Sequence, residues 1–151
     1  MPSNAKLMIL LVDDDPHAAS LLQEAFRRKA MPLPVHTCSN GNDAMAYLKG
    51  EGYYSDRTLF PFPRVLITDL QMPGCNGFEL LEWLQQHPEC SIIPKIVLSG
   101  SAEEPDVIRA YRLGANCIFA KPATFDELCA LVELVQRFWQ MALIPPLPEK
   151  C

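Results

Sequence analysis

The chain has 151 residues and a formal net charge of −5, with 49% hydrophobic and 21% charged residues. This length suits one ordinary domain, and this balance is typical of a globular protein rather than a disordered or membrane-spanning one. The acidic charge argues against nucleic acid as a direct partner, because affinity for phosphates depends on clustered Lys and Arg. The longest apolar run near the start, residues 7–12, is too short for a membrane anchor or a signal peptide, so we expect a cytoplasmic protein that does not bind membranes.

Five short apolar runs, rich in β-branched and large aliphatic residues, predict buried strands. They cover residues 6–12, 34–38, 64–68, 95–99 and 116–120. Each run is followed by a segment with helical spacing of apolar residues, namely Ala18–Lys29, Gly41–Lys49, Gly77–Gln86, Glu103–Leu113 and Thr124–Met141. Strands that alternate with helices in this way predict an α/β fold, with a five-stranded parallel sheet and helices on both faces.

We place one domain over residues 6–140. Residues 1–5 form a short tail before it, and the Pro-rich residues 141–151 form a tail after it, which we expect to be extended and frayed. No internal repeat or low-complexity segment suggests a second unit.

Two aromatic regions leave a choice between packing and partner binding. The last predicted helix carries an apolar arc wider than one core contact needs. The arc is either fully buried in the domain or partly in contact with a partner. The loop with Tyr53, Tyr54, Phe60 and Phe62 is expected to pack back onto the domain.

Six cysteines are scattered along the chain without a C-x-x-C pair or a histidine cluster at zinc-ligand spacing. They are Cys38, Cys75, Cys90, Cys117, Cys129 and Cys151. In a reducing cytosol we expect most of them to be free, buried hydrophobic residues rather than disulfide partners or metal ligands.

Polar side chains follow four of the five predicted strands. Asp13, Asp14 and Asp15 follow the first strand and Asp69 the third, while Ser99 ends the fourth and Lys121 follows the fifth. The carboxyl ends of parallel strands share one edge of a sheet, and ligands bind there, beside the point where strand order reverses. A sheet order of 2-1-3-4-5 would make strands 1 and 3 neighbours at that point.

In that order Asp13, Asp14 and Asp69 converge at the edge. Three carboxylates so close repel one another unless a cation neutralises them, and an all-oxygen site that retains water suits Mg²⁺. Lys121 adds a fixed positive charge and Ser99 a hydroxyl donor. Together these groups can hold a phosphoryl group in transfer, with the Asp69 carboxylate as the attacking group.

Four motifs occur along the chain in this order: "ILLVDDDP", "VLITDLQMPGCNGFELL", "IVLSGSA" and "GANCIFAKP". In combination they resemble the receiver domain of bacterial two-component response regulators, over roughly residues 6 to 140. The resemblance implies a flavodoxin-like fold, and a switch protein that assists its own phosphotransfer and dephosphorylation rather than an enzyme.

By this resemblance, Asp69 accepts a phosphoryl group from a phosphohistidine on a histidine kinase. Mg²⁺ is then held by Asp14, Asp69 and the backbone carbonyl of Gln71, with Asp13 acting largely through water.

The resemblance also implies that Ser99 and Lys121 bind the phosphoryl oxygens, and that the bond from Lys121 to Pro122 is cis. Gln71 and Ser101 would tune the lifetime of the aspartyl phosphate.

One departure from the family concerns its switch aromatic, because that position is Ile118 here, with Phe119 on the opposite strand face. An aromatic rotamer change at residue 118 therefore cannot carry the output. Asn76 replaces a common Asp and can still cap the helix that follows.

The chain ends 30 residues after Lys121, so we expect a stand-alone receiver that signals through a changed contact with a downstream protein. The connection over residues 49–63 and the ending "VQRFWQ" resemble single-domain regulators that partner phytochrome-type kinases. Some of these regulators pair, which makes a homodimer a further hypothesis.

Two other functions fit parts of the pattern. A phosphatase with an aspartate nucleophile would carry a second Asp two residues after Asp69 as general acid, where this chain has Gln71. A receiver-like binding module that works without phosphorylation is compatible with Ile118. The presence of the acidic residues Asp13 and Asp14 and of Lys121 argues against it.

Overall fold

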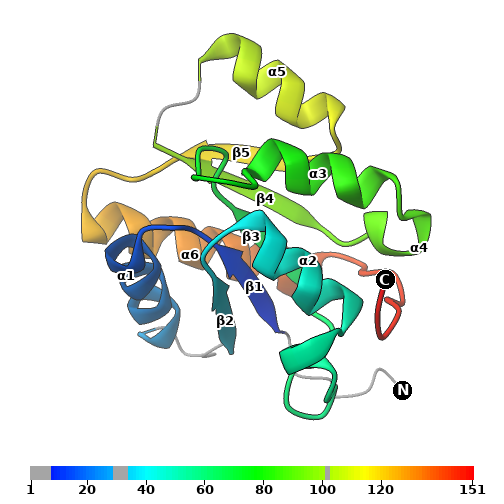
Figure 1. Ribbon diagram of the computed structural model, residues 1–151. Helices are drawn as coiled ribbons and strands as arrows, with labels where there is room; N and C mark the ends of the chain where they lie inside the picture. Colours follow the sequence, from blue (N-terminus) through cyan, green and yellow to red (C-terminus); the bar gives the residue numbers. More distant parts are fainter. Residues whose placement is uncertain (1–7, 29–33, 101–102) are drawn as a thin grey trace.

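The computed structural model of the protein describes residues 8–28, 34–100 and 103–151 (Figure 1). The strands are β1 (Ile9–Val12), β2 (Val35–Cys38), β3 (Val65–Thr68), β4 (Lys95–Ser99) and β5 (Cys117–Ala120). The helices are α1 (Pro16–Arg27), α2 (Gly41–Lys49), α3 (Gly77–Gln85), α4 (Pro88–Ser91), α5 (Glu104–Arg112) and α6 (Phe125–Met141), with a 3₁₀ turn η1 (Gly52–Tyr54). Every predicted strand and helix is present; residues 6, 7 and 29 of the predicted segments lie outside the described residues.

The strands are all parallel and lie in the order β2-β1-β3-β4-β5, which confirms the predicted fold. Val12 at the end of β1 pairs with Cys38 on one side and with Thr68 on the other. Ser99 at the end of β4 pairs with Ala120 at the end of β5. This register brings the residues that follow the strands to a common edge.

Successive side chains of a strand point to opposite faces of the sheet, and here each face has its own core. Leu10 and Val12 of β1 pack with residues of α2 and α3, whereas Ile9 and Leu11 pack with residues of α1 and α6. All four side chains are buried, as expected for a parallel sheet covered on both faces. In Figure 1, α1 and α6 accordingly lie together, apart from α2 and α3.

Side-chain caps fix the first residues of three helices, and Asn76 among them was predicted to cap. Asp15, Asn76 and Thr124 accept hydrogen bonds from the backbone N–H groups of His17, Glu79 and Glu127, respectively. Each cap satisfies a donor that the first helical turn cannot pair internally, which fixes where the helix starts.

The short elements η1 and α4 were not predicted, because three or four residues carry no readable periodicity. The aromatic loop around η1 packs on the domain, as predicted, through Tyr54, Phe60 and Phe62. Tyr53 is the exception, with 78% of its surface exposed.

The expectation of a frayed Pro-rich tail is wrong, and one pair of cysteines is an exception to the expectation that most of them are free. Cys90 in α4 forms a disulfide with Cys151, so these two cysteines are not free. The tail folds back to the carboxyl end of α2, where the Cys151 N–H donates to the Leu48 carbonyl at 3.0 Å, so its far end is anchored rather than frayed. The other four cysteines are free, and Cys38 and Cys75 among them are buried as expected.

None of the helices in the described part of the chain combines the length and the apolar character needed to cross a membrane.

Gly77 at the start of α3 allows the helix to lie directly against the end of β3. A Cβ at this position would lie 2.0 Å from the backbone carbonyl oxygen of Asp69. This contact was not predicted from the sequence, because it depends on how closely α3 approaches β3.

We expect Gly77→Ala to lower the free energy of unfolding by about 3 kcal/mol, since the new methyl group overlaps backbone atoms that cannot move aside. Urea denaturation measures this loss. Gly100→Ala is the control, because a Cβ at residue 100 would lie 3.8 Å from its nearest neighbour, Cδ of Lys121. This substitution should leave the free energy of unfolding nearly unchanged. Equal stability of both variants would contradict the close approach.

Candidate functional site

The site lies at the carboxyl edge of the sheet, where β1 and β3 end side by side. Asp13 follows β1, and Asp69 follows β3 and donates its own N–H to the Val12 carbonyl at 2.9 Å. Both carboxylates are largely buried, each residue being 7% exposed, while Asp14 is exposed. The strand pairing therefore places two carboxylates at the rim of the core, as the sequence predicted.

Backbone donors fix the orientation of the two buried carboxylates. Oδ1 of Asp69 accepts hydrogen bonds from the N–H groups of Leu70 at 2.7 Å and Gln71 at 3.3 Å. Oδ1 of Asp13 accepts from the N–H of Asp15 at 3.0 Å. In each carboxylate the second oxygen, Oδ2, is left to face the other charges of the site.

Lys121 lies between these two oxygens. Its Nζ is 2.9 Å from Oδ2 of Asp69 and 3.0 Å from Oδ2 of Asp13. The residue follows β5 directly, and its N–H donates to the Ser99 carbonyl at 2.9 Å, which aims the side chain across the strand ends.

The environment of Lys121 favours its charged form. Partial burial alone would lower its pKa, but the hydrogen bonds and negative charges of Asp69 and Asp13 outweigh this, so the pKa is raised above its ordinary 10.5. Lys121 therefore stays charged at neutral pH, and it loses its charge only as the pH rises through this raised value.

The carboxylates of Asp13, Asp14 and Asp69 are grouped closely enough to bind one cation, since a ligand oxygen from each lies within 4.8 Å of the others. Three carboxylates and one ammonium group leave two formal negative charges, and a divalent cation would balance them. Oxygen donors of this kind suit hard divalent cations.

Ser99 also lies at this edge, at the end of β4. It is 1% exposed, and its hydroxyl has no hydrogen-bond partner among the residues that the structure describes. A buried hydroxyl without an acceptor is uncommon, and such a group often awaits a ligand.

Sequence reasoning missed the part played by Thr68, although a polar residue at the end of an apolar run was a usable signal. Its buried Oγ1 donates to the backbone carbonyl of Asp69 at 2.8 Å. This bond helps to hold the backbone from which the Asp69 carboxylate extends.

The remaining predicted positions have different outcomes. Ile118 packs beside Ala110 of α5 while Phe119 packs on the opposite face, as predicted from strand alternation. Ser101 lies outside the described residues. The peptide bond from Lys121 to Pro122 is trans, so the expectation of a cis bond is wrong.

Comparison with known proteins gives concordant matches. The family model described as response regulator receiver domain matches residues 9–133. Response regulator Rcp1 of Synechocystis sp. is 33% identical over 137 residues, covering 91% of this chain and 91% of that protein. The structure of the phosphorylated cyanobacterial phytochrome response regulator RcpA matches with a TM-score of 0.85 at 34% identity, covering 94% of this chain and 100% of that one. The Mn²⁺-bound form of Rcp1 matches with a TM-score of 0.81 at 31% identity, covering 92% of this chain and 99% of that one.

Replacing Lys121 by Met should lower the free energy of unfolding by about 2 kcal/mol at neutral pH, because two buried carboxylates then lose their shared counter-ion. Added divalent cation should recover part of this loss by binding the folded state. Urea denaturation with and without the cation measures both effects, and Lys150→Met serves as an exposed control. An unchanged stability of Lys121→Met would show that the ion pairs contribute nothing.

Proposed function

Because the chain belongs to the response regulator receiver domain family, we propose that its Asp69 accepts a phosphoryl group from a phosphohistidine of a histidine kinase. The observation that carries this proposal is the placement of Asp69 Oδ2 against Lys121 Nζ, next to the carboxylates of Asp13 and Asp14. Phosphorylation-dependent signalling is the function of the family, and the chain acts as a phosphoacceptor module.

The arrangement of charges suits attack by a carboxylate on phosphorus. An oxygen of Asp69 forms the new bond to phosphorus as the bond from phosphorus to the histidine nitrogen breaks. Lys121 balances negative charge on the phosphoryl oxygens, and the unpartnered hydroxyl of Ser99 donates a hydrogen bond to one of them. These groups stabilise charge that is spread over the oxygens during transfer.

The cation of this site is proposed to be Mg²⁺, held by Asp14, Asp69 and the backbone carbonyl of Gln71, with Asp13 assisting largely through water. The two uncompensated negative charges support a divalent ion, and so does the Mn²⁺-bound form of the related Rcp1. When bound, Mg²⁺ supplies the positive charge that brings a phosphoryl dianion towards Asp69.

The output is proposed to be a changed contact with a downstream protein. On phosphorylation, Ser99 and Lys121 move towards the new dianion and shift the ends of β4 and β5, and with them α5 and α6. Ile118 transmits this shift through its packing beside Ala110 of α5, without an aromatic switch.

The partners are proposed to be a phytochrome-type histidine kinase and a downstream protein target in the cytoplasm. The relative RcpA, a cyanobacterial phytochrome response regulator, supports this choice of kinase. The apolar residues Leu134 and Phe138 of α6, which are 55% and 61% exposed, support a protein contact on that helix. Such a contact with a second copy would form a homodimer.

Incubation with Mg²⁺ and a small acyl phosphate should add one phosphoryl group to the protein, visible by intact-mass spectrometry. Asp69→Asn should remain unmodified, because the amide is not nucleophilic, while Asp126→Asn at an exposed position of α6 should react normally. An unmodified wild-type protein, or equal modification of Asp69→Asn, would contradict the assignment.

Asp13→Asn should weaken Mg²⁺ binding by about tenfold or more, since it removes one of the charges that attract the cation. Isothermal titration calorimetry measures the affinity. Asp15→Asn is a matched control, because Asn also caps helices and residue 15 serves α1 rather than the cation. If both variants lose the same affinity, Asp13 has no special part in the site.

A further inference from the structure

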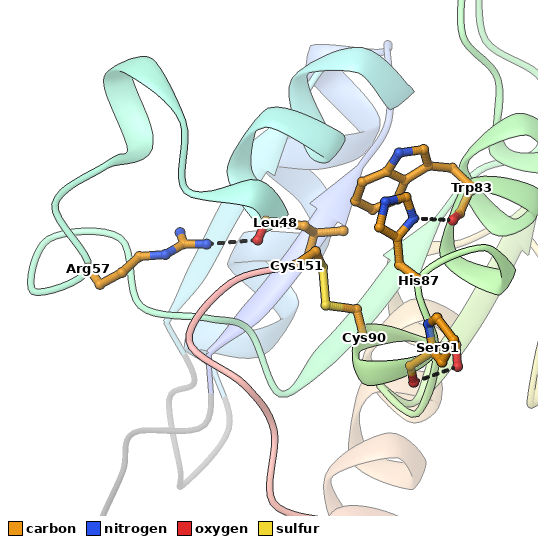
Figure 2. Close-up of a disulfide and its surroundings, with 8 residues drawn as sticks. Leu48, Arg57, Trp83, His87, Cys90, Ser91 and Cys151 are labelled. Atoms are coloured by element: carbon orange, nitrogen blue, oxygen red, sulfur yellow. Dashed lines mark hydrogen bonds between the residues drawn. A yellow bond between two sulfur atoms is a disulfide. The ribbon is translucent and has the colours of Figure 1, made fainter.

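The disulfide between Cys90 and Cys151 joins two parts of the chain that differ in how firmly they are held. Figure 2 shows the bond between the short helix α4 and the returning tail. It lies beyond the amino end of β4, whereas Asp69 lies at the carboxyl edge of the sheet. The pair is therefore separate from the proposed phosphorylation site.

Cys90 is on a well-fixed turn. It is fully buried, and its N–H donates to the His87 carbonyl at 2.9 Å. The ammonium group of the buried Lys95 donates to the carbonyls of Ser91 and Ile93, which closes the end of α4 around Cys90. These hydrogen bonds hold Cys90 independently of the tail.

Cys151 is on a weakly held segment. Residues 142–151 form no helix or strand, and Leu143 among them is fully exposed. The Cys151 N–H donates to the Leu48 carbonyl, which also accepts from Arg57 (Figure 2), while Leu147 and Cys151 pack against the core cluster of α2 and α3. Prolines at 145, 146 and 148 have no N–H to donate. The covalent bond thus adds a restraint to a segment that is otherwise held by one backbone hydrogen bond to Leu48 and by partly buried side chains.

From this asymmetry we propose that Cys90 and Cys151 form a reversible thiol–disulfide site, which takes low-molecular-weight disulfides as oxidants and thiols as reductants. The site controls whether residues 145–151 dock on α2 and α4. Disulfides in reducing compartments are usually transient and redox-sensing, so the proposed cytoplasmic location favours a reversible bond over a permanent one.

Cys90 is fully buried whereas Cys151 is partly exposed, so Cys151 reacts first with a small disulfide. In the reduced protein, the thiolate of Cys151 on the released tail attacks a small disulfide, forming a mixed disulfide and releasing one small thiol. When the tail docks, the Cys90 thiolate attacks the Cys151 sulfur and releases the second small thiol. The two protein thiols lose two protons and two electrons, which convert one small disulfide into two thiols.

The free cysteines are poor competitors for this reaction. Burial is the main cause that raises the pKa of the Cys38, Cys75 and Cys117 thiols, which leaves less of the reactive thiolate at neutral pH. Cys129 is half-buried on α6, and it offers a matched control for substitution.

The test compares the oxidised and reduced full-length protein by thermal unfolding and by hydrogen exchange of residues 143–151. Reduction should lower the Tm by about 5 °C or more, because an unfolded chain without this cross-link gains entropy. It should also speed exchange in the tail by about tenfold or more. Cys151→Ser should show the reduced behaviour under both conditions, whereas Cys129→Ser should respond like the wild type.

Titration with oxidised and reduced glutathione, followed by thiol alkylation and mass spectrometry, should give a reversible two-electron transition confined to Cys90 and Cys151. The site is excluded if no disulfide forms between these residues, if it cannot be reduced in the folded protein, or if Cys151→Ser keeps the redox-dependent shift in Tm. Acyl phosphate labelling of Asp69 in both redox states reports separately on the phosphorylation proposal, so either idea can fail alone.

Discussion

The ammonium group of Lys121 lies between the carboxylates of Asp13 and Asp69, at 3.0 Å and 2.9 Å, and the rest of the site depends on this contact. Two buried carboxylates side by side would repel each other, and the lysine makes their proximity tolerable without removing all the negative charge. The negative charge that remains would attract a divalent cation, and under the proposed function the cation and Lys121 together would offset the negative charge of an incoming phosphoryl group. The same three residues stabilise the folded state and, under the proposed function, would also take part in phosphoryl transfer.

The pairing of the strands brings the three residues of this contact together. Strand pairing levels the ends of β1 and β3, so that Asp13 and Asp69 become neighbours, and the pairing of Ser99 with Ala120 sets where Lys121 begins. Close packing of Gly77 against the Asp69 carbonyl and the hydrogen bond from Thr68 keep the end of β3 in place. Small losses at these supports should reach the site, because they move a backbone that carries a reactive carboxylate.

Much of this was readable from the sequence, because it follows from local patterns. The alternation of apolar runs with helical segments predicts the sheet, and polar residues at the strand ends predict Asp13, Asp69, Ser99 and Lys121 as one group. Features that depend on long-range packing were not readable. The pairing of Cys90 with Cys151 requires the tail to fold back to the carboxyl end of α2, and the clearance at Gly77 requires the approach of α3 to β3; neither leaves a periodic signal. The trans bond before Pro122 differs from what the family resemblance implied.

We propose that Asp13, Asp14, Asp69 and Lys121 form one pocket, which holds a single divalent cation beside the carboxylate that receives a phosphoryl group. Anomalous diffraction from crystals grown with Mn²⁺ tests this most directly. We expect one strong peak at the carboxyl edge of the sheet, within coordination distance of Asp14, Asp69 and the Gln71 carbonyl. Saturating Mn²⁺ with no peak at this edge, or with a peak only elsewhere on the protein, would contradict it.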